Sequence, residues 1–306
     1  TRMRAFHWKE DFERVRKFLI ETHRQTGTFQ NWIPSMFENR KFGPGGSLYS
    51  EEEDEFVKIW EDTNASSEPR IIAVTIRKPS GSCWIQIHPD YRESEKEIIE
   101  TLEFQVRESM KDQDGETKIQ FLVAESDGVR QKHLAELGYE NLGVEEHNRS
   151  RPVDLPVPDS TLPEGFSIRH VDINEEYEKY RDLQGAVFKH MGNMKREQAK
   201  LYSEASFYNA DLDLVAVDPN GRFASFVTVR IDPVSKMAEL EPVGTHPDYR
   251  GMGLAKAAIL EGLRRVAKYS PTCMVILGAA STEGATKLYD SLGFSKEDVH
   301  LWQKRL

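Results

Sequence analysis

The sequence predicts an α/β (α+β) protein made of two tandem units, each a central mixed β-sheet flanked by helices. Three observations support this fold class. The chain has 306 residues, and domains commonly contain about 150 residues, so two fit well. A proline-rich segment, RSRPVDLPVPDSTLP at 149–163, interrupts the middle of the chain. The string His-Pro-Asp-Tyr-Arg occurs at 88–92 and again at 246–250.

A second pair of landmarks indicates that the two halves are copies of one unit. Leu-Gly-Tyr at 137–139 corresponds to Leu-Gly-Phe at 292–294, with similar helix and strand patterns between the landmarks. Proline fixes φ and removes a donor, so the segment between the copies should be extended. We therefore expect a first unit over residues 3–148, a linker over 149–163 and a second unit over 164–306, with Thr1 and Arg2 preceding a natural start at Met3.

The second unit shows the pattern of a mixed sheet. Strands are predicted at 166–169, 212–218, 222–232, 237–245, 273–279 and 299–304, and helices at 175–190, 195–208, 251–269 and 285–292. Pro219-Asn220-Gly221 is a strong hairpin turn between two of the strands. A strand meander followed by a strand–helix–strand crossover implies a mixed sheet with helices on its faces.

Composition narrows the class of function. The net charge is −10, which argues against a nucleic-acid partner because such proteins need a concentrated basic surface. No apolar run is long enough to span a membrane, so we expect a soluble, cytoplasmic protein with no membrane partner. The two cysteines, Cys83 and Cys273, form neither a metal-binding nor a disulfide pattern. No metal site is predicted.

The segment Arg250-Gly-Met-Gly-Leu-Ala255 has the features of an anion-binding turn. Gly251 and Gly253 allow close backbone approach and unusual φ. The helix that follows directs unpaired N–H groups and the positive end of its dipole to the turn, and Arg250 adds a charge. A Walker loop does not fit, and a dinucleotide fingerprint fits only if Ala255 replaces its third glycine. On glycine spacing alone, a tight turn that binds no ligand remains an alternative.

Two signatures in the second unit resemble the GNAT superfamily of acetyltransferases. The first is Arg250 to Ala255 after a strand, and the second is Ala285-Thr-Lys-Leu-Tyr289-Asp-Ser-Leu-Gly-Phe294. The resemblance covers residues 165–306 and implies an acetyl-CoA site. It assigns the CoA pyrophosphate to Arg250 and to the backbone of Gly251, Met252, Gly253, Leu254 and Ala255. It assigns the pantetheine arm to the strand backbone at Val243, Gly244 and Thr245. Thr282 stands where the family usually has asparagine, and we expect it to be a weaker contact.

Acyl transfer to an amine needs a base for the ammonium proton and an acid for the thiolate. The resemblance implies that Tyr289 is the acid, whereas packing on the sheet is the alternative. Glu239 and Glu241 are the candidate bases, because both would face one side of a regular strand unless a bulge separates them. His246 is more consistent with a structural role in the turn.

The first unit has lost the features of a cofactor site. Its His-Pro-Asp-Tyr-Arg string is followed by Glu93-Ser-Glu-Lys-Glu97 without glycines, and Leu134 stands at the position of Tyr289. We therefore expect one acetyl-CoA per chain. Aromatic residues and an acidic run at 51–55 indicate a core and a solvated face, or the wall of an acceptor pocket. The aromatic residues are Phe29, Trp32, Phe37, Phe42, Tyr49 and Trp60.

The function predicted from these patterns is an N-acetyltransferase that moves an acetyl or other acyl group from its CoA thioester to a primary amine. A small-molecule acceptor is expected, and the acidic composition favours a cationic one. Two alternatives stay open: a non-catalytic acyl-CoA sensor or interaction module, and a nucleotide-phosphate binder of another type. The sequence leaves the acceptor, the acyl length, the choice between the two glutamates and the oligomeric state undetermined.

Overall fold

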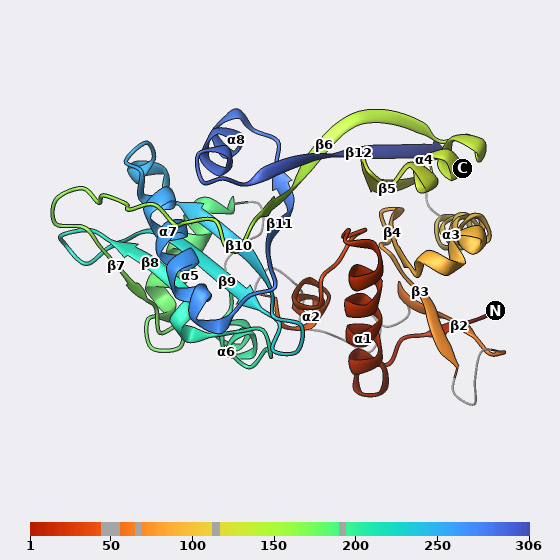
Figure 1. The fold of residues 1–306 in the computed structure, drawn as a ribbon, viewed down its shortest axis with the longest axis horizontal. Helices are drawn as coiled ribbons and strands as arrows, with labels where there is room; N and C mark the ends of the chain where they lie inside the picture. Colours follow the sequence, from red (N-terminus) through yellow and green to blue (C-terminus); the bar gives the residue numbers. More distant parts are fainter. Residues whose placement is uncertain (44–55, 65–68, 112–116, 190–193) are drawn as a thin grey trace.

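Each half of the chain forms a similar succession of strands and helices. The computed structural model (Figure 1) describes residues 1–43, 56–64, 69–111, 117–189 and 194–306. The first half contains β1 (Arg2–Ala5), α1 (Trp8–Thr26), α2 (Pro34–Phe42), β2 (Val57–Asp62), β3 (Arg70–Arg77), β4 (Ser82–Ile87), the 3₁₀ helix η2 (Pro89–Ser94), α3 (Glu95–Met110), β5 (Lys118–Ala124), α4 (Gly128–Glu136) and β6 (Glu140–Arg151). The second half contains β7 (Ser167–His170), α5 (Tyr177–Val187), α6 (Arg196–Ser203), η4 (Ala210–Leu212), β8 (Asp213–Val217), β9 (Phe223–Ile231), β10 (Met237–Thr245), η5 (Pro247–Tyr249), α7 (Leu254–Val266), η6 (Ala267–Tyr269), β11 (Cys273–Ala280), α8 (Glu283–Asp290) and β12 (Ser295–Arg305).

In the described part of the chain, the strands of both halves join into one sheet of twelve strands in the order β1-β2-β3-β4-β5-β12-β6-β11-β10-β9-β8-β7. The pairs β4–β5 and β10–β11 are parallel, whereas β5–β12, β12–β6 and β6–β11 at the centre are antiparallel. The predicted mixed α/β fold with helices flanking the sheet is therefore confirmed. Instead of two separate sheets, however, the two units share a continuous one.

The sheet is continuous because the two halves exchange their last strands. Strand β6 pairs with β11 of the second half, and β12 pairs with β5 of the first half. The two exchanged strands also pair with each other along the middle of the sheet. Figure 1 shows β6 and β12 running together across the top of the molecule, and the C-terminus lies beside the first half.

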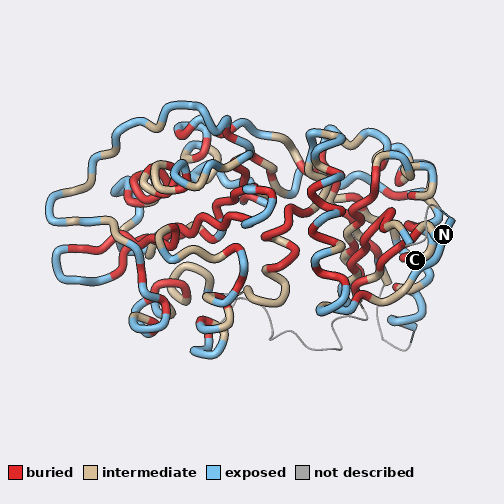
Figure 2. The backbone as a smooth tube through the Cα atoms, turned by 60° about the horizontal axis from the view of Figure 1, so that its bottom comes forward, coloured by how far each residue is buried: buried red, intermediate tan, exposed pale blue. Residues whose placement is uncertain are grey.

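Helices cover both faces of the sheet in the second half. Helices α7 and α8 pack on one face, where buried side chains include Val229, Leu240 and Ile276. Helices α5 and α6 pack on the other face, against Val215 and Phe226. In Figure 2 the buried segments follow the strands and the inner sides of these helices, whereas the connecting loops are mostly exposed.

The first half also contacts the second half through side chains on its helices. Ile33 and Met36 pack against Met237 and Val275, on the face opposite α7. A buried ion pair crosses the same boundary, because Arg16 Nε lies 3.0 Å from Asp232 Oδ1. Removing one member of such a pair would leave an unpaired buried charge, which costs more free energy than a surface ion pair contributes.

Several predictions about element bounds and surface can be compared with the structure. Strand β6 extends through Arg151, so the start of the predicted linker belongs to the sheet, while the proposed unit boundaries remain predictions. Tyr49 and the acidic run at 51–55 lie outside the described residues.

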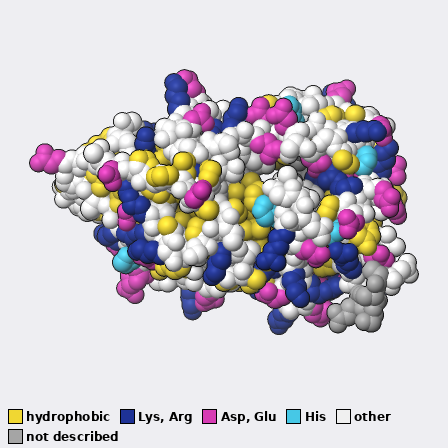
Figure 3. All heavy atoms as spheres, in the orientation of Figure 1, with side chains coloured by type: hydrophobic (Ala, Val, Ile, Leu, Met, Phe, Trp, Pro, Cys, Tyr) yellow, Lys and Arg dark blue, Asp and Glu magenta, His cyan; other side chains and the backbone are white. Residues whose placement is uncertain are grey.

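None of the helices in the described ranges is long and apolar enough to cross a membrane. On the face drawn in Figure 3, acidic and basic side chains are interspersed.

Candidate active site

The turn between β10 and α7 has the backbone geometry that its glycines suggested. Strand β10 ends at Thr245, and α7 begins at Leu254 with Gly253 as its N-cap. Gly251 and Gly253 each have a φ of +77°, in the left-handed region where a side chain would be strained. The first N–H groups of α7 therefore face the turn without helical partners, together with the positive end of the helix dipole.

Arg250 and His246 have different roles in this turn. Within the described part of the chain, the exposed Arg250 side chain makes no ion pair, so its guanidinium is available to an anion. His246 Nδ1 accepts a hydrogen bond of 3.2 Å from the backbone N–H of Asp248. That bond fits the structural role expected of His246, because the imidazole orders the turn that leads to Arg250.

A groove with a volume of about 800 Å³ extends from the turn to α8. Most of the predicted cofactor-binding residues and the predicted acid line it, namely Val243, Gly244, Thr245, Arg250, Gly251, Gly253, Leu254, Ala255, Thr282 and Tyr289. Met252 is exposed and lies outside this lining. The structure therefore brings together two sequence signatures that are separated by about one helix and one strand.

The groove also contains residues that sequence reasoning did not select. Val187 reaches it from α5, Lys256 from the first turn of α7 and Lys287 from the last turn of α8. Both lysines could have been found as basic residues, because Lys256 directly follows the first signature and Lys287 lies within the second. Val187 carries no comparable signal, because only the packing of α5 across β10 brings it there.

Strands β10 and β11 separate beside the groove. Their parallel pairing ends at Glu239 and Val275, although β10 continues to Thr245 and β11 continues to Ala280. Beyond that point β9 is the one strand that pairs with β10 among the described residues. The backbone N–H and C=O groups on its other edge are therefore free to bind an extended ligand, much as another strand would.

A bulge in β10 places the two candidate bases in different surroundings. The register with β9 shifts between Leu240 and Val243. Glu239 is only 2% exposed, and its Oε1 lies 3.4 Å from Arg230 Nη1. Glu241 is exposed, and partial desolvation by the surrounding protein atoms raises the pKa of its carboxylate, against the lowering effect of Arg230. Neither carboxylate is part of the groove lining.

Tyr289 combines a buried ring with a place in the groove lining. Burial, helped by the negative charge of Glu241, raises the pKa of Tyr289 to about 12, whereas the Arg149 guanidinium lowers it. Arg149 belongs to the exchanged strand β6, and its Cζ lies 5.5 Å from the centre of the Tyr289 ring. The electrostatic surroundings of Tyr289 thus come from both halves of the chain.

Thr282 has a structural task besides its place in the groove. It is the N-cap of α8, and its Oγ1 accepts a hydrogen bond of 3.3 Å from the N–H of Ala285. The hydroxyl hydrogen is not used in this bond and can still be donated to a ligand. Thr282 therefore remains a candidate contact.

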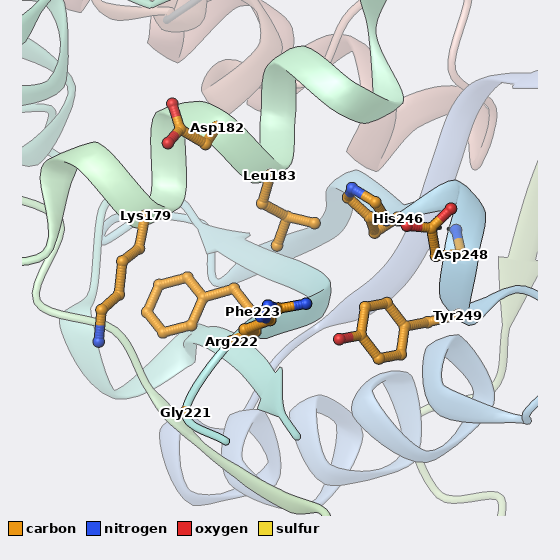
Figure 4. Close-up of a pocket in the computed structure, with 9 residues that line it drawn as sticks. All are labelled: Lys179, Asp182, Leu183, Gly221, Arg222, Phe223, His246, Asp248 and Tyr249. Carbon is orange, nitrogen blue, oxygen red and sulfur yellow. Dashed lines mark hydrogen bonds and ion pairs between the residues drawn. The ribbon is translucent and has the colours of Figure 1, made fainter. Parts of the chain in front are cut away.

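A second pocket, with a volume of about 350 Å³, lies on the other side of the same turn. Figure 4 shows Lys179 and Leu183 of α5 directed towards the Gly221–Phe223 turn and η5, while Asp182 lies at the rim of the pocket and points away. Tyr249 lines both this pocket and the groove. Its hydroxyl donates a hydrogen bond of 2.7 Å to Asp218 Oδ2, which anchors the wall between the two.

The corresponding turn of the first half is filled by its own side chains. Arg92 Nη2 lies 2.9 Å from Glu95 Oε2 and 2.5 Å from Asp127 Oδ1. The other oxygen of Glu95 lies 2.6 Å from Nε of the buried Arg130. Carboxylates of the protein thus occupy the start of α3. The corresponding position in the second half, the start of α7, is open.

Comparisons with known proteins agree with this arrangement. Residues 174–294 match the model of the Acetyltransferase (GNAT) family. A mycothiol acetyltransferase of Arthrobacter sp. (strain FB24) is 29% identical over 153 residues, covering 48% of this chain and 47% of that protein. The mycothiol acetyltransferase of Pseudarthrobacter chlorophenolicus is 24% identical over 262 residues, covering 83% of this chain and 77% of its own. The first of these matches thus spans about half the length of the relative.

Solved structures extend the likeness to both halves of the chain. A GCN5-related N-acetyltransferase from Sphaerobacter thermophilus has a TM-score of 0.68 with 16% identity, covering 99% of this chain and 95% of that one. A tandem GNAT protein from the clavulanic acid biosynthesis pathway has a TM-score of 0.66 with 14% identity, covering 99% and 98%. Residues 174–294 thus match the GNAT acetyltransferase family, and the fold of the whole chain resembles that of tandem GNAT proteins.

Proposed function

We propose that this protein transfers an acetyl group from acetyl-CoA to a primary amine of a small molecule. The observation that carries the proposal is the groove, which joins an open anion-binding turn at Arg250 to Tyr289 along the unpaired edge of β10. A CoA thioester has parts that match these features in order along the groove. Its pyrophosphate matches the anion-binding turn, its extended arm with amide groups matches the strand edge, and its reactive carbonyl matches the end at Tyr289. The relatives named mycothiol acetyltransferase support acetyl transfer.

In the proposed reaction the amine nitrogen attacks the thioester carbonyl carbon. Glu241 removes a proton from the ammonium group, directly or through water, because its carboxylate has solvent access and a raised pKa. The C–S bond breaks as the tetrahedral intermediate collapses, and Tyr289 donates its phenolic proton to the leaving thiolate. The proton held by Glu241 then passes to solvent, and the second proton lost by the attacking nitrogen restores the Tyr289 phenol, directly or through water.

We also propose that each chain binds one acetyl-CoA, in its second half. Arg250 and the N–H groups of α7 are open to a pyrophosphate, whereas Arg92 is paired with Glu95 and Asp127. A phosphate at the first site would have to displace two carboxylates and would be repelled by them. The first half therefore supports the fold without a cofactor.

The test uses the full chain, acetyl-CoA and a panel of primary amines, with release of free thiol as the readout. Wild type should release thiol only when an amine is present. Arg250→Glu should abolish CoA binding in calorimetry, because it replaces the exposed cation of the turn with an anion. Lys268→Glu, in the 3₁₀ helix η6 that follows α7, should leave CoA binding unchanged.

The outcomes separate the proposal from its alternatives. CoA binding without turnover of any amine would favour a non-catalytic acyl-CoA module. Competition by ATP or NAD at equal affinity would indicate a nucleotide-phosphate binder of another type. Unchanged CoA affinity in Arg250→Glu would remove the turn from the binding site.

A further inference from the structure

A small pocket lies between the two halves, on the side of β11 opposite α8. Its volume is about 220 Å³, and it is lined by Trp32, Met36 and Trp84 from the first half, Glu146 from β6, and Leu277 and Gly278 from β11. Asn148, which also lines it, alternates along β6 with Arg149, the residue that contacts Tyr289. Because neighbouring residues of a strand point to opposite faces, the pocket and the groove lie on opposite sides of the sheet.

The strand register connects this pocket to the reaction centre. The parallel pairing of β10 with β11 ends with Glu239 opposite Val275. Glu241 and Leu277 each lie two residues beyond this last pair, where the two strands no longer pair with each other. The pairing of β11 with β6 also shifts between Ile276 and Ala279, so Leu277 and Gly278 lie in a bulge. An acceptor in the pocket would therefore approach the gap from the face opposite the groove.

Glu146 gives the pocket a negative charge that the protein does not neutralise. Within the described ranges this carboxylate is half-buried and forms no ion pair, and burial together with Glu145 raises its pKa. Gly278 leaves room for it, because a Cβ there would lie only 3.3 Å from Glu146 Oε2. A half-buried carboxylate without a cation is costly, and a cationic ligand would remove that cost.

The walls of the pocket are apolar and held in place. Trp32 and Trp84 contribute indole rings, and Met36 contributes a thioether. The preceding segment is anchored to the end of β4, because the Gln30 side chain exchanges two hydrogen bonds of 2.8 Å with the backbone of Ile87. Aromatic walls around one carboxylate are suited to an organic cation, whose methylene groups contact the rings while its charge meets the acid.

We propose that the acceptor carries at least two cationic amino groups, one acetylated beside Glu241 and the other bound by Glu146. This inference rests on the proposed acetyltransferase function and specifies its substrate class. The first half thereby contributes to acceptor selection, and the chain prefers diamines or polyamines to monoamines of equal length.

The test compares α,ω-diaminoalkanes with n-alkylamines of the same chain length, using the full chain and thiol release from acetyl-CoA. Wild type should show a higher kcat/KM for the diamines. Glu146→Gln should lower kcat/KM for the best diamine by about tenfold or more, mainly through KM, because a charged hydrogen bond is lost. The same substitution should change kcat/KM for the monoamine less than about twofold, since no second charge is present to bind.

Glu145→Gln is the matched control, because Glu145 is exposed and adjacent to Glu146 but does not line the pocket. It should leave the diamine preference unchanged. Equal kcat/KM for diamines and monoamines in wild type, or an equal loss for both in Glu146→Gln, would overturn the inference while leaving acetyl transfer intact. Failure with every amine, despite CoA binding, would instead overturn the proposed function and the inference with it.

A misfolded variant is distinguished by cofactor binding. CoA affinity, measured by calorimetry, should be the same in wild type and Glu146→Gln because the groove lies on the other face. If CoA affinity falls in parallel with diamine activity, Glu146 supports the fold rather than the acceptor, and the proposal is wrong.

Discussion

The surroundings of Glu241 and Glu239 differ more than their positions in the sequence suggest. Glu239 is enclosed with Arg230, whereas Glu241 follows the point where β10 leaves β11 and has solvent access. A base must exchange its proton with solvent after each turnover, and only Glu241 combines a raised pKa with that access. We therefore favour Glu241 as the base and Glu239 as the counterion of Arg230.

This assignment predicts a pH dependence. The base must be deprotonated, so kcat/KM should fall as the pH is lowered through the pKa of Glu241, which burial raises above the ordinary glutamate range. Glu241→Gln should lower kcat by about a hundredfold and remove this acidic limb. The measurement is kcat/KM against pH for both proteins. An acidic limb that persists in Glu241→Gln would assign the base elsewhere.

Tyr289 provides a second prediction at the residue scale. Tyr289→Phe removes the proton for the leaving thiolate but keeps the buried ring, so kcat should fall by about a hundredfold while CoA affinity is retained. Turnover and calorimetry measure the two quantities separately. Tyr269→Phe, at the end of the 3₁₀ helix η6 that follows α7, is the control and should keep full activity. Full activity in Tyr289→Phe would leave the tyrosine with a packing role.

Among the elements, the turn before α7 shows how closely backbone geometry and binding are linked. Gly251→Ala introduces a side chain at a φ of +77° but into open space. Strain in the left-handed region, about 1–2 kcal/mol, should therefore be the main effect. CoA affinity should fall by about tenfold if the turn relaxes to another conformation. Calorimetry measures the loss, and unchanged affinity would show that this φ is not required.

The element scale also shows which features could be predicted from the sequence. The strand at 237–245, the hairpin turn at 219–221 and the strand after residue 273 were predicted close to their observed bounds, because local periodicity and turn chemistry determine them. The glycine spacing likewise predicted the open turn. The bulge after Leu240 was left as an alternative, since it depends on pairing with β9 rather than on any local pattern.

At the scale of the whole molecule, strand partners were beyond prediction. A strand such as Glu140–Arg151 is equally suited to β5 of its own half or β11 of the other, and only tertiary packing decides between them. The contacts of Arg149 with Tyr289 and of Glu146 with Gly278 follow from that exchange. No sequence pattern within one half could have revealed them.

The exchange predicts a long-range effect of truncation. Deleting residues 295–306 removes β12 from the C-terminus, but β12 pairs with β5 of the first half. Amides of β5 should therefore lose protection in hydrogen-exchange measurements, because their backbone partners are gone. Amides of β8, near the opposite end of the sheet, serve as the internal reference and should change little. An equal loss of amide protection in β5 and β8 would indicate global unfolding instead.

The exchanged strands also bear on how such a chain persists through evolution. A duplicated unit that no longer binds its cofactor is normally expendable, and deletions would remove it without loss. Here the first unit supplies β6 to the edge of β11, beside the reaction centre, and receives β12 in return. Neither unit can be deleted without opening the sheet of the other. Reciprocal dependence of this kind would preserve a first unit that binds no cofactor, as we propose for this chain.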